Sequence, residues 1–467
     1  MTKQYNSKAI LMAILICAFA GMFSETALNI AITRLMEVFD ITAPTAQWLT
    51  TGYLLTLGVV MPVSGILIQS VPTRQLFFGA TTSLALGTFL AALSVNFEML
   101  MFARVLQALA MGILLPLMFN TVMVIFPMEK RGSAMGMIGL VLSFAPALGP
   151  AVSGILIQYM SWRMIFWLLL PFILFGIFVA YKNLENVTEV KKQKIDILSV
   201  VLSTLGFGSI VYGFSLMGES FTNPTALIIV GIGIVALIGF VLRQNREEPL
   251  LNLSVFKYPI YVMGMLLVLM CMFTAMSTMI ILPMYMQTGV GLSVLITGLM
   301  LLPGSIVNGS LQLMAGRIFD AYGHKVLIIP GLIIMLISLF IFTTLTPESN
   351  IALIVLSHVI LMGGIAIVWT GAQTYGMNQL SPHLYPHGSA VLNTLLQVNG
   401  AVGTAIAVSI LTIGKNKYLK TNNNISDAIV YGSNHVFIML LIIVGIGFIV
   451  GLMLSNNKII KKLKRSI

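Results

Sequence analysis

The stretch "AILMAILICAFAGMFSETALNIAIT" (Ala9–Thr33) is an almost unbroken apolar run, long enough to cross a bilayer as a helix. Of the 467 residues in the chain, 58% are hydrophobic and only 8% are charged. A soluble domain has roughly 25% charged residues, and a water-soluble fold of this size could not bury so much apolar surface. The composition therefore predicts an all-α polytopic membrane protein. No small-residue cleavage site follows the first run, so we interpret it as a retained helix and not as a signal peptide.

Similar apolar runs recur along the whole chain and predict fourteen membrane-spanning helices. Their limits are 9–33, 48–69, 75–95, 98–125, 135–159, 164–182, 196–217, 224–243, 260–284, 293–315, 326–346, 351–377, 388–413 and 435–455. An even number of spans puts both termini on one side of the membrane. That side holds nineteen of the 25 Lys and Arg residues, against five on the other side and one within a span. Because cytoplasmic loops carry the excess of these residues, both termini are predicted to be cytoplasmic. The basic segments could also contact lipid headgroups.

The chain also repeats a loop. "GILIQSVPTR" (Gly65–Arg74) follows the second span, and "GRIFDAYGHK" (Gly316–Lys325) follows the tenth. These places correspond if two six-helix bundles, at 1–182 and 258–455, flank an inserted two-helix segment at 183–257 and precede a basic tail at 456–467. Transporters built from such repeats bind substrate between the halves and expose the site alternately to each side. The alternative is that Gly and a basic residue simply recur in short loops.

Five motifs carry a resemblance to a known family. They are "SETALNIA" (24–31), "ARVLQALAMGILLP" (Ala103–Pro116), "SFAPALGPAVSG" (Ser143–Gly154), "SWRMIF" (Ser161–Phe166) and "GRIFDAYGHK". Over essentially its whole length the chain resembles the fourteen-helix drug/proton antiporter branch of the major facilitator superfamily, which includes exporters of quaternary ammonium compounds and lincosamides. The motif at 143–154 is the most diagnostic, because it resembles exporters and not uptake members. The resemblance implies a multi-pass protein of the bacterial plasma membrane that exports drugs.

The resemblance also assigns residues to gating. They are Arg131, Gly149, Pro150, Gly154, Gly316, Asp320, Gly323 and Lys325. Gly149 and Pro150 would let the fifth span bend and pack closely, although small residues pack membrane helices in any case. The first copy of the loop motif departs from the family, because Gln69 stands where the family has an Asp that helps to latch the cytoplasmic gate. A charged latch is therefore not expected in the N-terminal half.

Glu25 and Arg104 are predicted to lie at similar depths in the membrane. Arg104 is six residues into the fourth span, and Glu25 is eight residues before the outer end of the first. At about 1.5 Å per residue, these positions are roughly 9 and 12 Å below the outer surface. Because an unpaired charge in the membrane is costly, we expect a direct or water-bridged interaction between them.

Glu98 and Asp196 stand at the first positions of their spans, so Glu25 is the only acid in the interior of a predicted span, and we expect it to be the proton-exchanging carboxylate. A proton and a cationic substrate would compete for it, and the pH gradient would then drive export. The family usually has Asp here, and Glu25 keeps the charge with one more methylene. The alternative is that Glu25 stays protonated and serves only as a structural hydrogen-bonding group.

Further polar and polarizable residues within the spans are candidates for contact with substrate. With Glu25 they are Asn29, Tyr53, Gln107, Met276, Met279, Asn308, Gln312, His358, Asn393 and Gln397. The pairs Asn308/Gln312 and Asn393/Gln397 are four residues apart and so share a helix face. Met276 and Met279 belong to a methionine-rich ninth span, which suits a cavity that accepts many shapes but could also be ordinary packing. His358 could relay protons or form an interhelical hydrogen bond.

These features predict a proton-coupled multidrug exporter of amphipathic, cationic drugs or dyes. No Gly-rich phosphate loop and no nucleophile–base–acid set is present, so we expect no ATP, cofactor or metal and no enzymatic activity. The two cysteines, Cys17 and Cys271, fall within spans, and the net charge of +11 is explained by membrane topology without nucleic acid. Protons, the drug and the bilayer are the expected partners of a monomer. The alternative is an exporter or flippase of an endogenous metabolite or lipid on the same fold.

Overall fold

The computed structural model describes residues 6–187, 196–217, 223–245 and 249–456. In this part of the chain, fourteen helices are long and apolar enough to cross a membrane, which confirms the predicted all-α architecture. They are α1 (Ser7–Phe39), α2 (Ala43–Ser70), α3 (Thr73–Leu93), α4 (Phe97–Ile125), α5 (Arg131–Tyr159), α6 (Met164–Asn183), α7 (Ile197–Met217), α8 (Pro224–Arg243), α9 (Pro259–Met284), α10 (Val294–Tyr322), α11 (Lys325–Thr343), α12 (Ile351–Met377), α13 (Tyr385–Leu419) and α14 (Ile425–Ser455). Short helical turns cover Met128–Lys130, Leu253–Lys257, Tyr285–Gly289 and Pro382–Leu384.

Several helices are longer than the predicted spans. They continue past the end of the apolar run and stop at a polar residue that caps the helix. α1 was predicted to end at residue 33 but runs to Phe39, where Asp40 adopts a left-handed conformation. α14 was predicted from residue 435 but begins at Ile425, and the Asn424 side chain accepts the Ser426 and Asp427 N–H groups. Similarly, α13 extends beyond the predicted limits of 388 and 413 at both ends.

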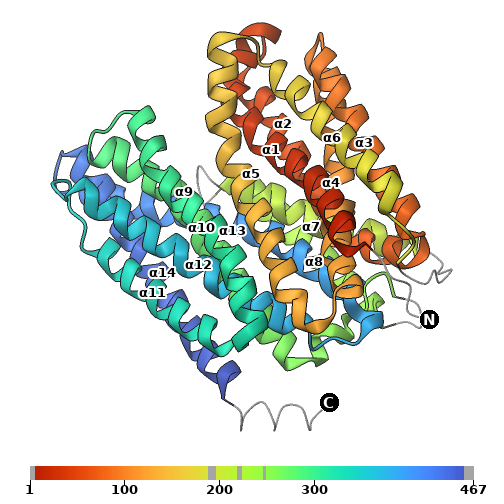
Figure 1. Cartoon of the computed structure of the whole chain (residues 1–467). Coiled ribbons are helices and arrows are strands. Elements are labelled where there is room, and N and C mark those ends of the chain that lie inside the picture. Colours follow the sequence, from red (N-terminus) through yellow and green to blue (C-terminus); the bar gives the residue numbers. More distant parts are fainter. Residues whose placement is uncertain (1–5, 188–195, 218–222, 246–248, 457–467) are drawn as a thin grey trace.

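The helices pack into two bundles. α1 to α6 contact one another in the N-terminal half, and α9 to α14 do so in the C-terminal half. Figure 1 shows these halves in red to yellow and in green to blue, and both ends of the described chain lie on the same side of the molecule. An even number of crossing helices requires that arrangement. That this side is cytoplasmic stays a prediction.

The bundles meet along two seams. α5 packs on α10 in one seam, and α2 packs on α13 in the other. α7, which pairs with α8, contacts both α2 and α13 and so lies along the second seam. The halves lean apart toward the end opposite the termini (Figure 1).

Glycines allow the α5–α10 seam to close tightly. A Cβ atom on Gly316 would collide with the Gly132 carbonyl, and one on Gly136 would lie 2.5 Å from the Gln312 carbonyl oxygen. Such close backbone approach is how membrane helices gain packing contacts where no hydrophobic effect drives them together. The seam therefore depends on small residues at fixed positions.

Candidate functional site

Arg104 is the centre of a buried polar cluster in the N-terminal bundle. Its side chain is fully buried, and Nη1 donates to Gln107 Oε1 at 2.9 Å and to Ser24 Oγ at 3.3 Å. Nε donates to the Leu49 carbonyl at 3.4 Å, and the guanidinium carbon lies 4.1 Å from the centre of the Tyr53 ring. Helices α1, α2 and α4 together hold the cation. All of its partners are uncharged.

Glu25 lies beside this cluster on α1 and is partly exposed. Its carboxylate interacts electrostatically with Arg104 and Tyr53. Among the ion pairs and hydrogen bonds of the described residues, however, none involves Glu25, so the expected direct contact with Arg104 is not formed. A water-bridged contact stays a prediction. The expected similar depth agrees with the electrostatic interaction.

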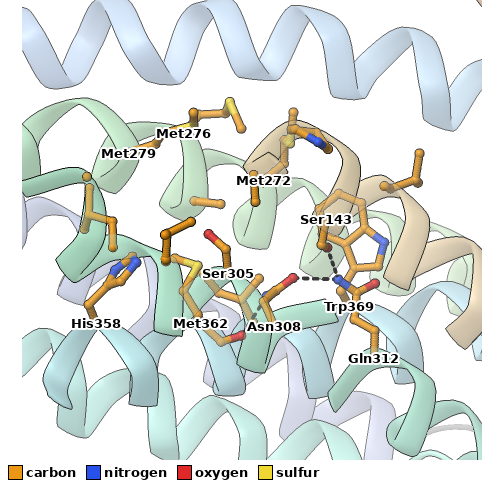
Figure 2. A pocket seen from close by; sticks show the side chains of 18 of the residues that line it. Ser143, Met272, Met276, Met279, Ser305, Asn308, Gln312, His358, Met362 and Trp369 are labelled. Carbon is orange, nitrogen blue, oxygen red and sulfur yellow. Dashed lines mark hydrogen bonds between the residues drawn. The ribbon is translucent and has the colours of Figure 1, made fainter. Parts of the chain in front are cut away.

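A cavity of about 480 Å³ lies between the two halves. α5 of the N-terminal half and α9, α10 and α12 of the C-terminal half line it. Most of the lining is apolar, and Met272, Met276 and Met279 of α9 form one wall (Figure 2). None of the described residues that line it is Asp, Glu, Lys or Arg.

Polar side chains form the wall opposite the methionines (Figure 2). The Gln312 amide nitrogen donates to Asn308 Oδ1 at 2.7 Å and to Ser143 Oγ at 2.5 Å. The bond to Ser143 joins α10 to α5 across the halves. Asn308 Nδ2 in turn donates to the Met362 carbonyl at 2.7 Å. Both N–H groups of Gln312 and one N–H group of Asn308 are thus bonded within the protein.

The structure brings together some of the predicted substrate residues and separates others. Met276, Met279, Asn308, Gln312 and His358 line the cavity. Glu25, Tyr53 and Gln107 belong instead to the Arg104 cluster, and Asn393 and Gln397 lie on α13 and are absent from the lining. The Asn393 amide donates to the Ser389 carbonyl at 2.8 Å, so its nitrogen is occupied locally. The side chain of Asn29 lies outside the described part of the structure.

Trp369, Ser143 and Ser305 also line the cavity and were not predicted. Trp369 could have been found, because it is eleven residues, about three helical turns, after the predicted residue His358 and therefore on the same face of α12. Its indole nitrogen donates to Gln373 Oε1 at 2.8 Å. Nothing in the sequence distinguishes the two serines from others within the spans.

Asp320 joins the halves at the end that carries the termini. Its carboxylate accepts the N–H groups of Gly132 at 2.7 Å and Ser133 at 2.8 Å, at the start of α5. The N-terminus of a helix offers free N–H groups and a positive dipole end, so it favours an anion. The predicted gating Asp therefore contacts the other half as an N-terminal cap of α5.

Arg131 makes a second connection at the same end. Its side chain donates to the Met123 carbonyl at 2.6 Å in its own half. It also donates to Asn378 Oδ1 at 3.1 Å and to the Tyr385 hydroxyl at 3.2 Å, both in the C-terminal half. On the other seam, the Gln69 amide lies 2.6 Å from His387 Nε2 of α13. The N-terminal half thus has an uncharged contact where the family has a charged latch.

The remaining predicted gating residues differ in their surroundings. Gly149 packs on α1, where an added Cβ would collide with Thr26 Oγ1 and lie 3.0 Å from the Ala27 nitrogen. An added Cβ on Gly154 would meet no atom within 4 Å. Gly323 has a φ of 78° and ends α10, a conformation that favours glycine. Lys325 begins α11, and the side chain of Pro150 lies outside the described part of the structure.

Comparisons with known proteins agree with this architecture. The sequence model described as the Major Facilitator Superfamily matches residues 14–404. The lincomycin resistance protein LmrB of Bacillus subtilis (strain 168) is 47% identical, over 98% of this chain and 98% of that protein. The LmrB protein of Listeria monocytogenes is also 47% identical, over 96% of this chain and 97% of that protein.

A solved structure has the same fold. The crystal structure of the human organic anion transporter MFSD10 (TETRAN) superimposes with a TM-score of 0.64 and covers 94% of this chain and 100% of that chain. The two sequences are 12% identical, so the likeness concerns the fold alone.

Proposed function

Because the chain belongs to the major facilitator superfamily, we propose that it exports amphipathic small molecules, drugs among them, in exchange for protons. Membership makes it a multi-pass transporter of the plasma membrane. Its relatives are named for resistance to lincomycin, so lincomycin is the first compound to test. The observation that carries the proposal is the acid–Arg cluster of Glu25 and Arg104 inside a transporter whose cavity lies between its halves.

Glu25 is suited to gain and lose a proton. Arg104 is held by the neutral acceptors Gln107, Ser24 and Leu49, so it keeps hydrogen bonds when Glu25 is neutral. When Glu25 is ionised, its negative charge attracts Arg104. Proton exchange therefore changes the interaction between α1 and α4 while Nε and Nη1 of Arg104 keep their hydrogen bonds.

The proton and the drug act at separate places. Glu25 is absent from the cavity lining, so the expected direct competition for one carboxylate would need the drug to leave the described cavity. We infer instead that α5 links the two places. Gly149 of α5 packs on the turn of α1 that contains Thr26, next to Glu25, and Ser143 of α5 lines the cavity. Movement of α1 would thus be transmitted to the cavity wall.

Alternating access follows from where the halves touch. Asp320 and Arg131 join them at the terminus side, so the described state is closed there. With the termini in the cytoplasm, the cavity would face outward, where the drug leaves and a proton enters. The expected preference for cationic compounds rests on Glu25 alone, since no acid lines the cavity.

The test is transport by Glu25→Gln in vesicles with an imposed pH gradient. The change keeps the shape of the side chain and removes the ionisable group. Proton-driven export of lincomycin and of the cationic dye ethidium should be abolished, and Glu25→Asp should restore part of it. Unchanged gradient-driven export by Glu25→Gln would contradict the assignment of Glu25 as the proton site.

The matched control is Glu37→Gln on the same helix. Glu37 pairs with Arg34 on the surface, where both side chains are about 60% exposed. Exposed ion pairs contribute little, so this variant should transport normally. In cells, a proton uncoupler should raise lincomycin accumulation to the level of the Glu25→Gln strain. Insensitivity to the uncoupler would contradict proton coupling as a whole.

A further inference from the structure

His387 joins three parts of the chain at the terminus side of the second seam. It is in the first turn of α13, and its side chain is 4% exposed. Its Nδ1 atom accepts the Asn252 backbone N–H at 3.2 Å, from the segment between α8 and α9. Its Nε2 atom lies 2.6 Å from the Gln69 amide at the end of α2. One imidazole thus connects the N-terminal half, the C-terminal half and the segment that follows the inserted pair.

The Asn252 contact fixes the protonation state of the ring. A backbone N–H can only donate, so Nδ1 presents a lone pair and the proton of the neutral ring is on Nε2. Nε2–H then donates to the Gln69 amide, which turns its oxygen to the ring, since the two ends of an amide have the same shape. This orientation gives up the 3.4 Å contact of the amide with the Gly65 carbonyl. The closed seam therefore requires a neutral His387.

The segment that donates to His387 is anchored to the inserted pair. Gln244, at the end of α8, accepts the Leu251 N–H through Oε1 at 3.0 Å. Its Nε2 atom donates to Ser199 Oγ of α7 at 3.3 Å, so both inserted helices hold the segment. The Asn252 N–H follows directly after this anchor and is thus fixed in direction.

A second proton would enter at Nδ1 and break this contact. Nδ1–H and the Asn252 N–H would then point at each other with no lone pair between them. The surroundings are tight, because a Cβ atom on Gly65 of α2 would lie 3.1 Å from Leu251 and 3.2 Å from Ala390. Separation of α2 from α13 would relieve the conflict and let water solvate the cation.

The closed seam offers no counter-charge to a protonated ring. The ionisable groups nearby are His383, exposed on the preceding turn, Arg131 of α5, which bonds to the first turn of α13, and Tyr261 of α9, which donates to a carbonyl of α13. Asp196, before α7, is bound by Arg243 at 2.6 and 3.0 Å, and α2 and α4 have no ionisable residue at this end. No ion pair or hydrogen bond of the described residues joins a carboxylate to the ring. The positive dipole end of α13 also disfavours a cation here.

We propose that His387 is a second proton-responsive group of the transporter, whose neutral ring closes the α2–α13 seam and whose protonation at Nδ1 opens it. His387 is a positioning residue in this role, because it acts through the two helices and does not line the cavity. With the termini in the cytoplasm, acidification of the cytoplasm would favour the state that takes up the drug. The inference rests on the alternating access of the proposed function and does not depend on Glu25.

The test measures the separation of the halves by pulsed electron spin resonance, on the full chain in lipid nanodiscs. Spin labels on Gln75 of α3 and Tyr322 of α10, which are exposed at the terminus side, report the distance across it. The two cysteines, Cys17 and Cys271, are replaced with alanine so that only these positions react. All proteins carry Glu25→Gln, which removes the proposed proton site, and are compared at about pH 7.5 and about pH 5.5, the range in which histidine titrates.

Acidification should raise the ratio of open to closed molecules about five-fold in this reference protein, the change expected when one hydrogen bond is lost. His387→Asn should stay closed at both pH values, because its amide oxygen can accept the Asn252 N–H and does not titrate. His387→Phe has no acceptor and should be open at both.

The matched control is His435→Asn, the same substitution at a histidine of α14 that contacts the Tyr431 carbonyl. It should open on acidification as the reference protein does. A response to acid that persists in His387→Asn would overturn the proposal, as would the absence of a response in the reference protein. If His387→Asn were open at both pH values, the ring would serve only to pack the seam, and the proposal would be wrong.

If His387→Phe fails to fold, the comparison of His387→Asn with the reference protein decides the matter. A response to acid that is lost in His387→Asn, together with unimpaired export by Glu25→Gln, would reject only the proposed proton site. Abolished export by Glu25→Gln without any response to acid at the seam would reject only the role of His387.

Discussion

The planar shape of the Arg104 guanidinium contributes to its interactions as much as its charge does. Its planar group spreads hydrogen bonds to α1, α2 and α4 while it stacks on the Tyr53 ring. The ammonium group of a lysine is a point charge on a flexible chain, so it cannot form these hydrogen bonds and stack on the ring at the same time. Arg104 thus links three helices, and it is also the positive charge that faces Glu25.

Arg104→Lys should therefore fold less stably and transport poorly, although it keeps the positive charge. Hydrogen bonds to charged groups contribute about 1.5–3 kcal/mol each, and several are lost. We expect a melting temperature lower by several degrees in detergent and lincomycin export slower by about tenfold or more. Arg34→Lys, at the exposed pair with Glu37, is the control and should match the parent in both measurements. Equal behaviour of the two variants would contradict the role of the planar group.

His324 gives the stability of the protein a dependence on pH. It lies between α10 and α11 and stacks on Tyr375 with the ring centres 3.7 Å apart. Burial lowers the pKa of His324 from 6.5 to about 4, and the charge of Lys325 adds to the effect. Below pH 6.5 the unfolded chain takes up a proton that the folded chain resists, so stability falls between pH 6.5 and 4 and is complete above 6.5.

His324→Phe should keep the stacking and remove this dependence. The measurement is the melting temperature in detergent at about pH 7.5 and about pH 5, since the window opens at the pKa of free histidine. The loss on acidification should be smaller in the variant than in the parent. His383→Phe serves as the control, because His383 is exposed on a short turn and should leave the loss unchanged. An identical loss in all three proteins would count against the assignment to His324.

At the scale of the element, α5 has a role that no single residue reveals. Its first turn receives the Asp320 carboxylate, its middle lines the cavity through Ser143, and Gly149 packs on α1. The sequence motif predicted a helix that bends and packs closely, but not the identity of its neighbours. Which helix each glycine faces depends on the relative rotation of helices, and a local pattern does not contain that information.

Gly316→Ala should prevent closure at the terminus side, because the added methyl would collide with the Gly132 carbonyl. The variant should populate the opposite conformation. Spin labels at exposed ends of α5 and α10 would then report a longer distance on that side, and export should fall by about tenfold if closure costs roughly 1.4 kcal/mol more.

Gly154→Ala, toward the other end of α5, is the control. Its added methyl meets open space, and alanine is the better helix former by about 1 kcal/mol. We expect normal export and an unchanged distance, even though the family motif includes this glycine. Loss of export in Gly154→Ala would show that the residue acts in a state other than the one described.

At the scale of the whole molecule, the features that the sequence predicted are those that depend on hydropathy and on counting residues along a helix. The fourteen spans and their order follow from apolar runs, and the electrostatic relation of Glu25 to Arg104 follows from helix rise. The cavity lining does not follow in this way. Asn393 and Asn308 are equally polar and both fall within predicted spans, yet only Asn308 reaches the cavity, because helix rotation and tilt are set by packing among all fourteen helices.

α7 touches both halves, at α2 and at α13. Its Tyr212 ring lies 5.6 Å from that of Trp48 on α2, and Leu55 of α2 lies 3.9 Å from the Cβ position of Gly208. A helix that contacts two bodies cannot stay fixed to both while they rotate against each other, so one of its surfaces must slide in every cycle. The resistance of the inserted pair to this sliding would then set how many transport cycles the protein completes each second, independently of what it carries.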